Sequence, residues 1–408
     1  MAFVSELPAP AVAGLSPVTA VLHVEFALLV GTADGELLLL DAASGSLLAR
    51  ARAHERSPVT HLASDSATTF VFVLQSGAVS HAACPLADAS LLSGGGADDV
   101  ATIDLQPPHP ECSAVSCMAP SWSRRLGTRL CCACLGEYAL HVFGFRQNHG
   151  DDVHGDEAAT SGDRRSSTTC ELQAIVPLQL PLGFEIASGL ASLAWAADDS
   201  VLLCDGVHFM LVPPLPMPGG PTRRESVSVA AMPVRTLQHW LEPPHARDGR
   251  LVGHARTFSL ATGEMIVLGP RKGGGTVALT FEAADWSVLQ REAPGTPTGA
   301  LGTLSRPALA LDGSGPPLDA VVGWPLLITC SRGHVRIYDL VEGLLVQAIR
   351  LPASATAGGG SGGSGGSSSS VPIRLSARGP HAVALSVGRA LFPVPAASGG
   401  WLAREVQW

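Results

Sequence analysis

Lysine and asparagine are almost absent from the 408-residue sequence, since Lys272 and Asn148 are the only residues of their kinds. Basic charge therefore rests on arginine, and 26 basic against 35 acidic residues give a formal net charge of −9. The arginine pairs at 124–125, 164–165 and 223–224 are isolated in polar stretches. Because nucleic-acid binding needs a clustered positive field that attracts phosphate, we expect no nucleic-acid partner.

Long apolar runs are also missing. No stretch of the sequence approaches the roughly 20 apolar residues that a helix needs to span a bilayer. The first residues, MAFVSELPAPAVAG, have no basic segment, and Glu6, Pro8 and Pro10 interrupt any apolar core of a signal peptide. We therefore expect a cytoplasmic protein whose contact with any membrane goes through a partner.

The nine cysteines are odd in number and irregular in spacing. A zinc site would need two paired C-x-x-C units or histidines at ligand spacing, and the sequence has neither. Strand alternation in RLCCACLGEYALHVF places Cys132 and Cys134 on one face and Cys131 on the other. We interpret the cysteines as buried, reduced thiols that pack as small apolar side chains.

Several strings resemble catalytic or ligand-binding motifs without meeting their requirements. In GPRKGGGT, residues 269–276, Lys272 precedes the glycines, whereas a phosphate-binding loop needs Gly-Lys-Ser/Thr at the start of a helix. His23 and Glu25 form H-x-E, but the P-C-x-x-C of zinc deaminases does not follow. HGDDVHGDE, residues 149–157, favours a solvated acidic loop, with weak metal binding as the alternative. We predict no catalytic, cofactor-binding or metal residues and no cofactor, and the binding residues stay unknown.

One segment of the sequence occurs twice. LLVGTADGELLLLDAASGSLLAR, residues 28–50, matches LLITCSRGHVRIYDLVEGLLVQAIRL, residues 326–351, at a single offset. The shared pattern is an apolar strand, a turn at glycine, an alternating strand that ends in aspartate, a second glycine turn and a third strand. Glycine suits tight turns that need positive φ, and aspartate can accept hydrogen bonds from the amides of the following turn. The aligned pairs are Gly35 with Gly333, Asp41 with Asp339, and Gly45 with Gly343.

Weaker copies of this segment bring the total to seven. Their turn glycines are Gly35, Gly77, Gly136, Gly206, Gly253, Gly333 and Gly388. Repeats of about 40–45 residues with four short strands are typical of propeller blades. The longer spacings predict insertions at 146–169 (polar), 213–224 (proline-rich) and 353–371 (Gly/Ser linker), which we expect to be disordered loops.

The repeats predict an all-β fold in which residues 1–408 form a single β-propeller of about seven four-stranded blades, similar to WD-repeat propellers. Stacking blades in a ring buries both faces of each blade, which a single blade cannot achieve alone. An array of two-sheet sandwiches is the competing fold. Trp195 and Trp324 lie in apolar strand patterns and are expected in the core.

Several segments resemble the citron-homology (CNH) propeller of vacuolar-sorting tether subunits, the Vam/Vps-thirty-nine type, and the TGF-β-receptor-associated (TRAP) protein. They are ALLVGTADGELLLLD (27–41), RLCCACLGEYALHVFGF (129–145), GLASLAWAADDSVLLCDGVHFMLV (189–212), PLLITCSRGHVRIYDLVEGLLVQAIRL (325–351) and HAVALSVGRALFPVP (381–395). Their order matches along essentially the whole chain. The family is identified by this pattern and not by catalytic residues.

The resemblance implies a non-enzymatic protein-interaction propeller of a HOPS- or CORVET-type tethering subunit. Such a protein would act in vesicle-mediated transport from endosome to vacuole or lysosome, and would bind a Rab-type GTPase or fellow tether subunits. A generic WD-repeat-type scaffold of another complex and a propeller enzyme with a central site are the alternatives. The pattern does not distinguish HOPS from CORVET, the face that binds, or the oligomeric state.

Members of this family continue past the propeller into a long α-helical solenoid, whereas the present sequence stops at Trp408. A truncated product, a partial gene product and a free-standing propeller are all consistent with the sequence. The Gly/Ser linker has no side chains to pack, so we expect deletion of residues 359–370 to leave folding intact.

Overall fold

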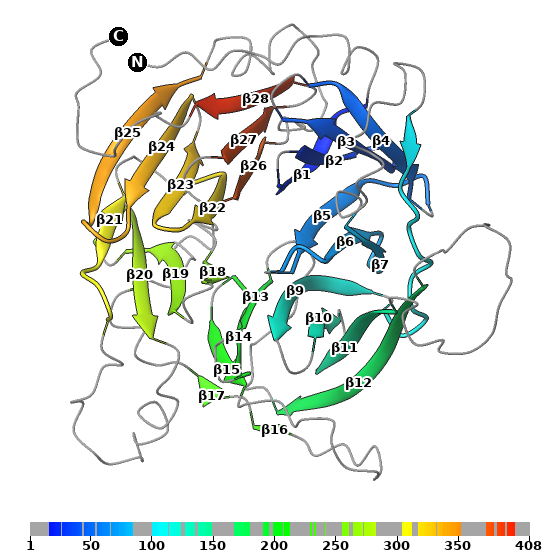
Figure 1. The fold of residues 1–408 in the computed structure, drawn as a ribbon. Helices are drawn as coiled ribbons and strands as arrows, with labels where there is room; N and C mark the ends of the chain where they lie inside the picture. Colours follow the sequence, from blue (N-terminus) through cyan, green and yellow to red (C-terminus); the bar gives the residue numbers. More distant parts are fainter. Residues whose placement is uncertain are drawn as a thin grey trace, which may run out of the picture.

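The fold is that of a β-propeller, as seen in a computed structural model (Figure 1). The structure describes residues 16–395 with gaps, the longer of which are 85–99, 149–166, 180–190, 213–228, 234–240, 242–254, 283–303, 312–316 and 352–372. Within these described ranges, all regular secondary structure is β-strand and no residue is helical. The predicted all-β propeller class is therefore confirmed.

The described strands form seven sheets that follow one another around a ring in chain order (Figure 1). We number them sheet 1 to sheet 7, although the strand count varies from three to five instead of being four throughout. The first strand of each sheet lies nearest the centre and contacts the first strand of a neighbouring sheet, as β1 does with β5 and β26. Contact between β1 and β26 brings the two ends of the described chain together.

Sheet 1 contains β1 (Val18–Val24), β2 (Ala27–Thr32), β3 (Glu36–Asp41), β4 (Leu47–Arg52) and β8 (Ala101–Thr102). Sheet 2 contains β5 (Val59–Ser64), β6 (Phe70–Gln75) and β7 (Ala78–Ala83). Sheet 3 contains β9 (Val115–Ser123), β10 (Gly127–Cys134), β11 (Ala139–Asn148), β12 (Ser167–Gln179) and β16 (Val229–Ala230).

Sheet 4 contains β13 (Ser192–Trp195), β14 (Val201–Cys204), β15 (Phe209–Val212) and β17 (Met232–Pro233). Sheet 5 contains β18 (Arg256–Ser259), β19 (Glu264–Pro270), β20 (Thr276–Glu282) and β21 (Leu309–Leu311). Sheet 6 contains β22 (Asp319–Gly323), β23 (Leu326–Ser331), β24 (His334–Asp339) and β25 (Leu344–Arg350). Sheet 7 contains β26 (Ile373–Arg378), β27 (Ala382–Val387) and β28 (Ala390–Pro395).

The core lies between neighbouring sheets. Alternate side chains of one strand point to opposite faces, so each strand packs against both neighbouring sheets. In β14, Val201 and Leu203 pack in a cluster with sheet 3, whereas Leu202 and Cys204 pack in a cluster with sheet 5. All four residues of β14 are buried. Because both faces of such a strand are covered, it is continuously apolar instead of alternating, which explains the apolar runs in the repeats. Full burial of each such aliphatic side chain contributes about 1.5–3 kcal/mol.

The duplicated segment folds as its sequence pattern predicts. Gly35 and Gly333 lie in the turns β2–β3 and β23–β24, with φ of +82° and +83°. Asp339 accepts hydrogen bonds from the backbone amides of Val341 (2.7 Å) and Glu342 (3.0 Å) in the next turn. The copies also share a β-bulge between their last two strands, in which Val346 of β25 corresponds to Leu48 of β4.

Two details differ from the sequence-based expectations. In sheet 5 the turn between the second and third strands contains Gly273–Gly275, all with positive φ, whereas Gly253 precedes the innermost strand β18 and lies outside the described residues. That copy of the repeat was placed two strands too early, because apolar residues flank both glycine positions. Trp324 lies in the β22–β23 turn and is only partly buried, whereas Trp195 is a core residue of β13.

The expected insertions fall largely outside the described residues. β11 and β12 pair as far as Asn148 and Ser167, so residues 146–148 and 167–169 belong to a hairpin. The remainder of 146–169, all of 213–224 and all of 353–371 lie outside the part that the structure describes. The acidic segment 149–157 falls there too.

Candidate interaction site

In sheets 1, 2, 4 and 6, the turn between the second and third strands makes the same backbone contact. The carbonyl oxygen of the turn glycine accepts a hydrogen bond from an amide that ends the outer strand or begins the next sheet. The contact fixes each hairpin tip to the connection that leads into the following sheet. The pairs are Gly35 with Ala53 (2.8 Å), Gly77 with Val115 (2.7 Å), Gly206 with Ala255 (3.2 Å) and Gly333 with Leu351 (2.9 Å).

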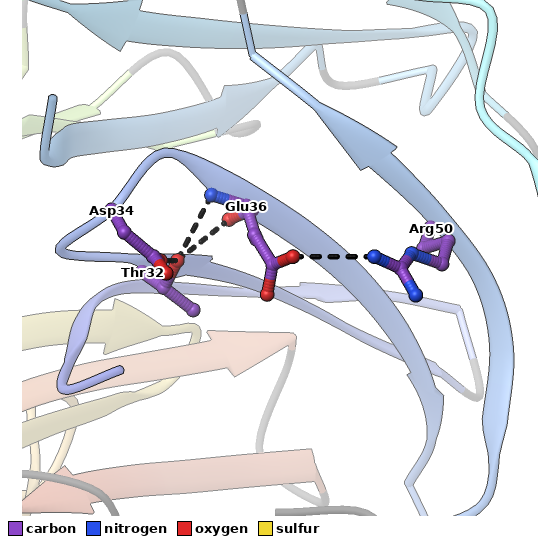
Figure 2. A network of polar contacts seen from close by, with 4 residues as sticks. All are labelled: Thr32, Asp34, Glu36 and Arg50. Carbon is purple, nitrogen blue, oxygen red and sulfur yellow. Dashed lines mark hydrogen bonds and ion pairs between the residues drawn. The ribbon is translucent and has the colours of Figure 1, made fainter. Parts of the chain in front are cut away.

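The hairpin tip of sheet 1 carries a network of charged and hydroxyl side chains (Figure 2). Thr32 Oγ1 donates to Asp34 Oδ1 at 2.5 Å and accepts from the backbone N–H of Glu36 at 2.9 Å. Arg50 Nη2, from the neighbouring strand β4, donates to Glu36 Oε1 at 3.2 Å. The Thr32 hydroxyl lowers the pKa of Asp34, so this exposed carboxylate is ionised at neutral pH.

The connection from sheet 1 to sheet 2 is fixed beside this tip. Gln75 Nε2 donates to the carbonyl oxygens of Glu55 and Ser57, both at 2.5 Å. Glu55 N–H donates to Gln75 Oε1 at 3.3 Å, and the hydroxyls of Ser57 and Ser76 lie 2.5 Å apart. We call residues 32–36, 50–53, 55–58 and 75–77 the turn face. This turn face combines a fixed backbone with exposed charges of both signs, among them Asp34, Glu55 and Arg56.

Polar side chains, among them the buried Asp319, join the innermost strands of sheets 5, 6 and 7. Arg256 Nη1 of β18 donates to Asp319 Oδ1 of β22 at 2.5 Å. The other oxygen, Asp319 Oδ2, accepts from the backbone N–H of Leu375 in β26 at 2.7 Å. Both carboxylate oxygens are therefore engaged in holding three sheets together.

The same kind of contact continues in both directions around the ring. Ser192 Oγ of β13 accepts from the backbone N–H of Thr257 in β18 at 3.2 Å. Ser376 Oγ of β26 accepts from the backbone N–H of His23 in β1 at 2.7 Å. These side chains satisfy buried backbone donors at the joints between sheets, so their role is structural.

Sheet 3 is joined to both of its neighbours through the start of β10. Thr128 Oγ1 donates to Asp65 Oδ2 of sheet 2, and Arg129 Nη2 forms an ion pair with Asp199 of sheet 4. The Arg129 guanidinium also lies 4.7 Å from the ring centroid of Trp195, a cation–π contact. Arg129 is 3% exposed and its charge is compensated within the fold.

The sequence did not identify these pairs. A charged residue inside the buried strand GTRLCCAC is a local signal that Arg129 needs a partner, but nothing in the sequence indicates that the partner is Asp199. The same holds for Asp319, which opens an apolar strand 63 residues after its partner Arg256.

The cysteines follow the sequence-based expectation. Cys131 packs in the cluster shared with sheet 4, and Cys132 and Cys134 pack in the cluster shared with sheet 2. None of the nine cysteines forms a disulfide, and all but Cys170 are buried. Burial raises the pKa of Cys131 and Cys132 and raises that of Cys170 to about 12, so these thiols are protonated and unreactive at neutral pH.

Other expected site features are placed as follows. Among the described residues, no group of three or more histidine, cysteine or acidic side chains could hold a metal ion. The segment 269–276 forms the turn between β19 and β20, with a strand and not a helix on each side, which agrees with its interpretation as a loop. Within the same described ranges, no helix is long and apolar enough to cross a membrane.

The chain shows low similarity to known proteins. No family model and no curated protein matches the sequence. Among solved structures, the chain is similar to the AfRom2 CNH domain, with a TM-score of 0.47 and 10% identity over 96% of this chain and 98% of that chain. It is also similar to the computationally designed Ika8 protein, with a TM-score of 0.45 and 14% identity over 95% of this chain and 98% of that chain. Similarities at this level assign neither a family nor a function.

Proposed function

We propose that this protein is a non-enzymatic interaction propeller, of the CNH type found in HOPS- or CORVET-like vesicle-tethering subunits. The observation that carries the interaction role is the turn face, where hydrogen bonds fix the backbone while charged side chains remain exposed. A surface that is already ordered loses little conformational entropy on binding, which favours recognition of another protein.

The charges buried between the sheets fit this role better than catalysis. Asp319 and Arg129 each pair within the fold, so they act as joints of the ring. A propeller held rigid in this way can present loop-built surfaces of roughly 800 Å² to each partner. Several weak contacts of this kind suffice in a tether, because multiple modules on one pair of vesicles raise the effective concentration.

The assignment to vesicle tethering rests on the resemblance of segments 27–41, 129–145, 189–212, 325–351 and 381–395 to CNH propellers. Accordingly, the partners we propose are a Rab-type GTPase or fellow tether subunits. The proposed location is the cytoplasmic side of endosome or vacuole membranes, reached through those partners, with no cofactor and no nucleic acid involved. The net charge of −9 disfavours direct docking on anionic lipid, where basic clusters would be needed.

We also propose that residues 1–408 form one propeller of about seven four-stranded blades, with 146–169, 213–224 and 353–371 as loop insertions. The seven sheets and their order around the ring support this blade count. Sheets 2 and 7 contain three strands each among the described residues.

The test is capture of partners through an N-terminal tag at the native locus, with mass spectrometry of the proteins that co-purify. Recovery of vacuolar-sorting core subunits is the expected result. Recovery of a different assembly, with none of those subunits, would replace the tether assignment with a generic WD-repeat-type scaffold.

A matched pair of variants links the captured partners to the turn face. The double substitution Glu55→Arg with Arg56→Glu reverses two exposed charges on that face and should reduce partner recovery at unchanged melting temperature. The control, Glu342→Arg, reverses one exposed charge in the β24–β25 turn and should leave recovery unchanged. Equal recovery from all three proteins would exclude the turn face as the binding surface.

A further inference from the structure

Two sheets receive an extra strand from the chain that belongs to the next sheet. β8 pairs in parallel with the outer strand β4 of sheet 1, although it follows β7, the third strand of sheet 2. β16 pairs in parallel with the outer strand β12 of sheet 3, although it follows β15, the third strand of sheet 4. In both cases the outer edge of one sheet is covered by a short segment from its successor.

These segments then continue onto their own sheet. Three residues after the start of β16, β17 pairs antiparallel with β15. Beyond β8, Gln106 forms an antiparallel bridge with His81 of β7. Apolar side chains accompany the crossing, as with Ile103, which is 4% exposed and whose N–H donates to the Arg50 carbonyl at 3.1 Å. Each segment therefore closes the outer seam between two sheets.

Sheet 6 has the same kind of outer edge without such a cover. β25 is the counterpart of β4 in the duplicated segment, and both carry the bulge. Among the described residues, no strand pairs with the outer edge of β25. Apolar side chains gather at its start, where Val341 is 44%, Leu344 47% and Leu345 37% exposed. An open strand edge beside exposed leucines favours pairing with a further strand.

We propose that residues 401–408, WLAREVQW, dock along the outer edge of β25 as a short parallel strand and cover Val341, Leu344 and Leu345. The segment follows β28, the third strand of sheet 7, as β8 follows β7 and β16 follows β15. Five small residues, AASGG at 396–400, separate it from Pro395. Two tryptophans, Leu402 and Val406 supply the apolar side chains that such a seam buries.

Hydrogen exchange of the whole chain tests this docking. In the variant that lacks residues 401–408, those amides of Leu344–Arg350 that do not bond to β24 should exchange at least tenfold faster than in the parent protein. The control variant, which lacks residues 359–370 of the Gly/Ser linker, should exchange them at the parent rate. Unchanged exchange in the first variant overturns the proposal.

Disulfide trapping tests the contact without removing the segment. Leu345→Cys combined with Leu402→Cys should form a cross-link within one chain, whereas Tyr138→Cys, at an exposed position beside β11 of sheet 3, combined with Leu402→Cys should not. Cross-linking only between two chains, together with a dimer of the parent protein in ultracentrifugation, would assign the edge to a second copy and overturn the proposal. Equal cross-linking by both pairs would also overturn it, because the contact would then have no specificity.

Discussion

At the scale of residues, the buried charges act as joints between sheets. Asp319 is 8% exposed and accepts from Arg256 and from the backbone of Leu375, so one carboxylate connects three innermost strands. A buried ion pair is weak evidence for net stabilisation, but removal of one partner leaves the other charge uncompensated. The role of such a residue is therefore tested by breaking the pair.

Asp319→Ala should lower the free energy of unfolding by about 1–3 kcal/mol, because it leaves the buried Leu375 N–H without an acceptor and the Arg256 Nη1 without its carboxylate partner. Asp319→Asn retains an oxygen for the Leu375 N–H and should be destabilised less. Urea unfolding of both variants measures the difference. Equal losses would mean that the hydrogen bond from the Leu375 N–H contributes nothing to the joint, because both variants lack the charge and only Asp319→Asn keeps an acceptor.

His81 gives the stability of the fold a dependence on pH. Its side chain is 7% exposed and packs edge-on against Phe145, with ring centroids 4.7 Å apart. Burial, with a smaller contribution from His109, lowers the pKa of His81 from 6.5 to about 4. The folded protein thus keeps His81 neutral at a pH where the unfolded chain binds a proton.

The stability that this neutral His81 contributes is fully present above pH 6.5 and is lost as pH falls toward 4, by on the order of 3 kcal/mol. His81→Leu should remove that part of the pH dependence while it fills the same apolar site. Chemical denaturation of both proteins at pH 7.5 and pH 4.5 measures it. A stability difference between them that is the same at both pH values would contradict this origin.

The sequence predicts which face of a strand each cysteine occupies, but it does not predict which charged residues form pairs. The faces of Cys131, Cys132 and Cys134 follow from strand alternation, which is a local property of the chain. The ion pair of Arg129 joins residues 70 apart, and no local pattern encodes such a partner.

At the scale of elements, the hairpin with a glycine turn is the unit that repeats. Gly35 and Gly77 have φ near +80°, and a Cβ on either residue would meet the connection to the next sheet. At Gly35 it would lie against the Glu55 carbonyl oxygen and 2.6 Å from Gln75 Nε2. Glycine is thus required there both for the backbone conformation and for the close approach of the next sheet.

Gly35→Ala should destabilise the fold by more than the roughly 1–2 kcal/mol that positive φ alone imposes on an L-residue. Gly274→Ala is the matched control, because Gly274 has φ +102° and a Cβ there would meet nothing within 4 Å. Thermal or urea unfolding of the two variants isolates the packing contribution. If both lose the same stability, the contact with the Glu55 loop has no energetic role.

The sequence predicted that hairpins form more reliably than it predicted which strands of a sheet each hairpin contains. The offset between residues 28–50 and 326–351 holds for the glycines, the aspartates and even the bulge. In sheet 5 the predicted turn at Gly253 lies two strands before the observed turn at Gly273–Gly275, because similar apolar and glycine patterns occur at both positions. Contacts between sheets, and not local pattern, decide which hairpin is innermost.

At the scale of the whole molecule, the ring closes through side-chain packing and hydrogen bonds. Sheet 7 meets sheet 1 where β26 contacts β1, and Ser376 accepts from the His23 backbone at 2.7 Å. Among the described residues, sheet 7 and sheet 1 share no strand. Closure therefore depends on sheet 7 being present as a unit.

A chain ended after residue 351 should lose cooperative unfolding and aggregate, because it exposes the faces of sheets 1 and 6 that sheet 7 covers. The control is deletion of residues 359–370, which lie outside the described part and have no side chains to pack; it should unfold cooperatively at the parent temperature. Calorimetry and size-exclusion chromatography compare the two. A large loss of melting temperature in the linker deletion would show that the blade boundary there is misplaced.

The sequence alone determined the all-β propeller class, the hairpin turns and the faces of the cysteines, because alternation and turn chemistry act over a few neighbouring residues. Only the tertiary structure decided which charges pair, as Arg256 does with Asp319, and which outer strands gain a parallel partner, as β4 does with β8. Those contacts join residues about 50 or more positions apart in the sequence. At such separations many pairings are possible in the chain, and only the packing of the sheets around the ring determines which pairing forms.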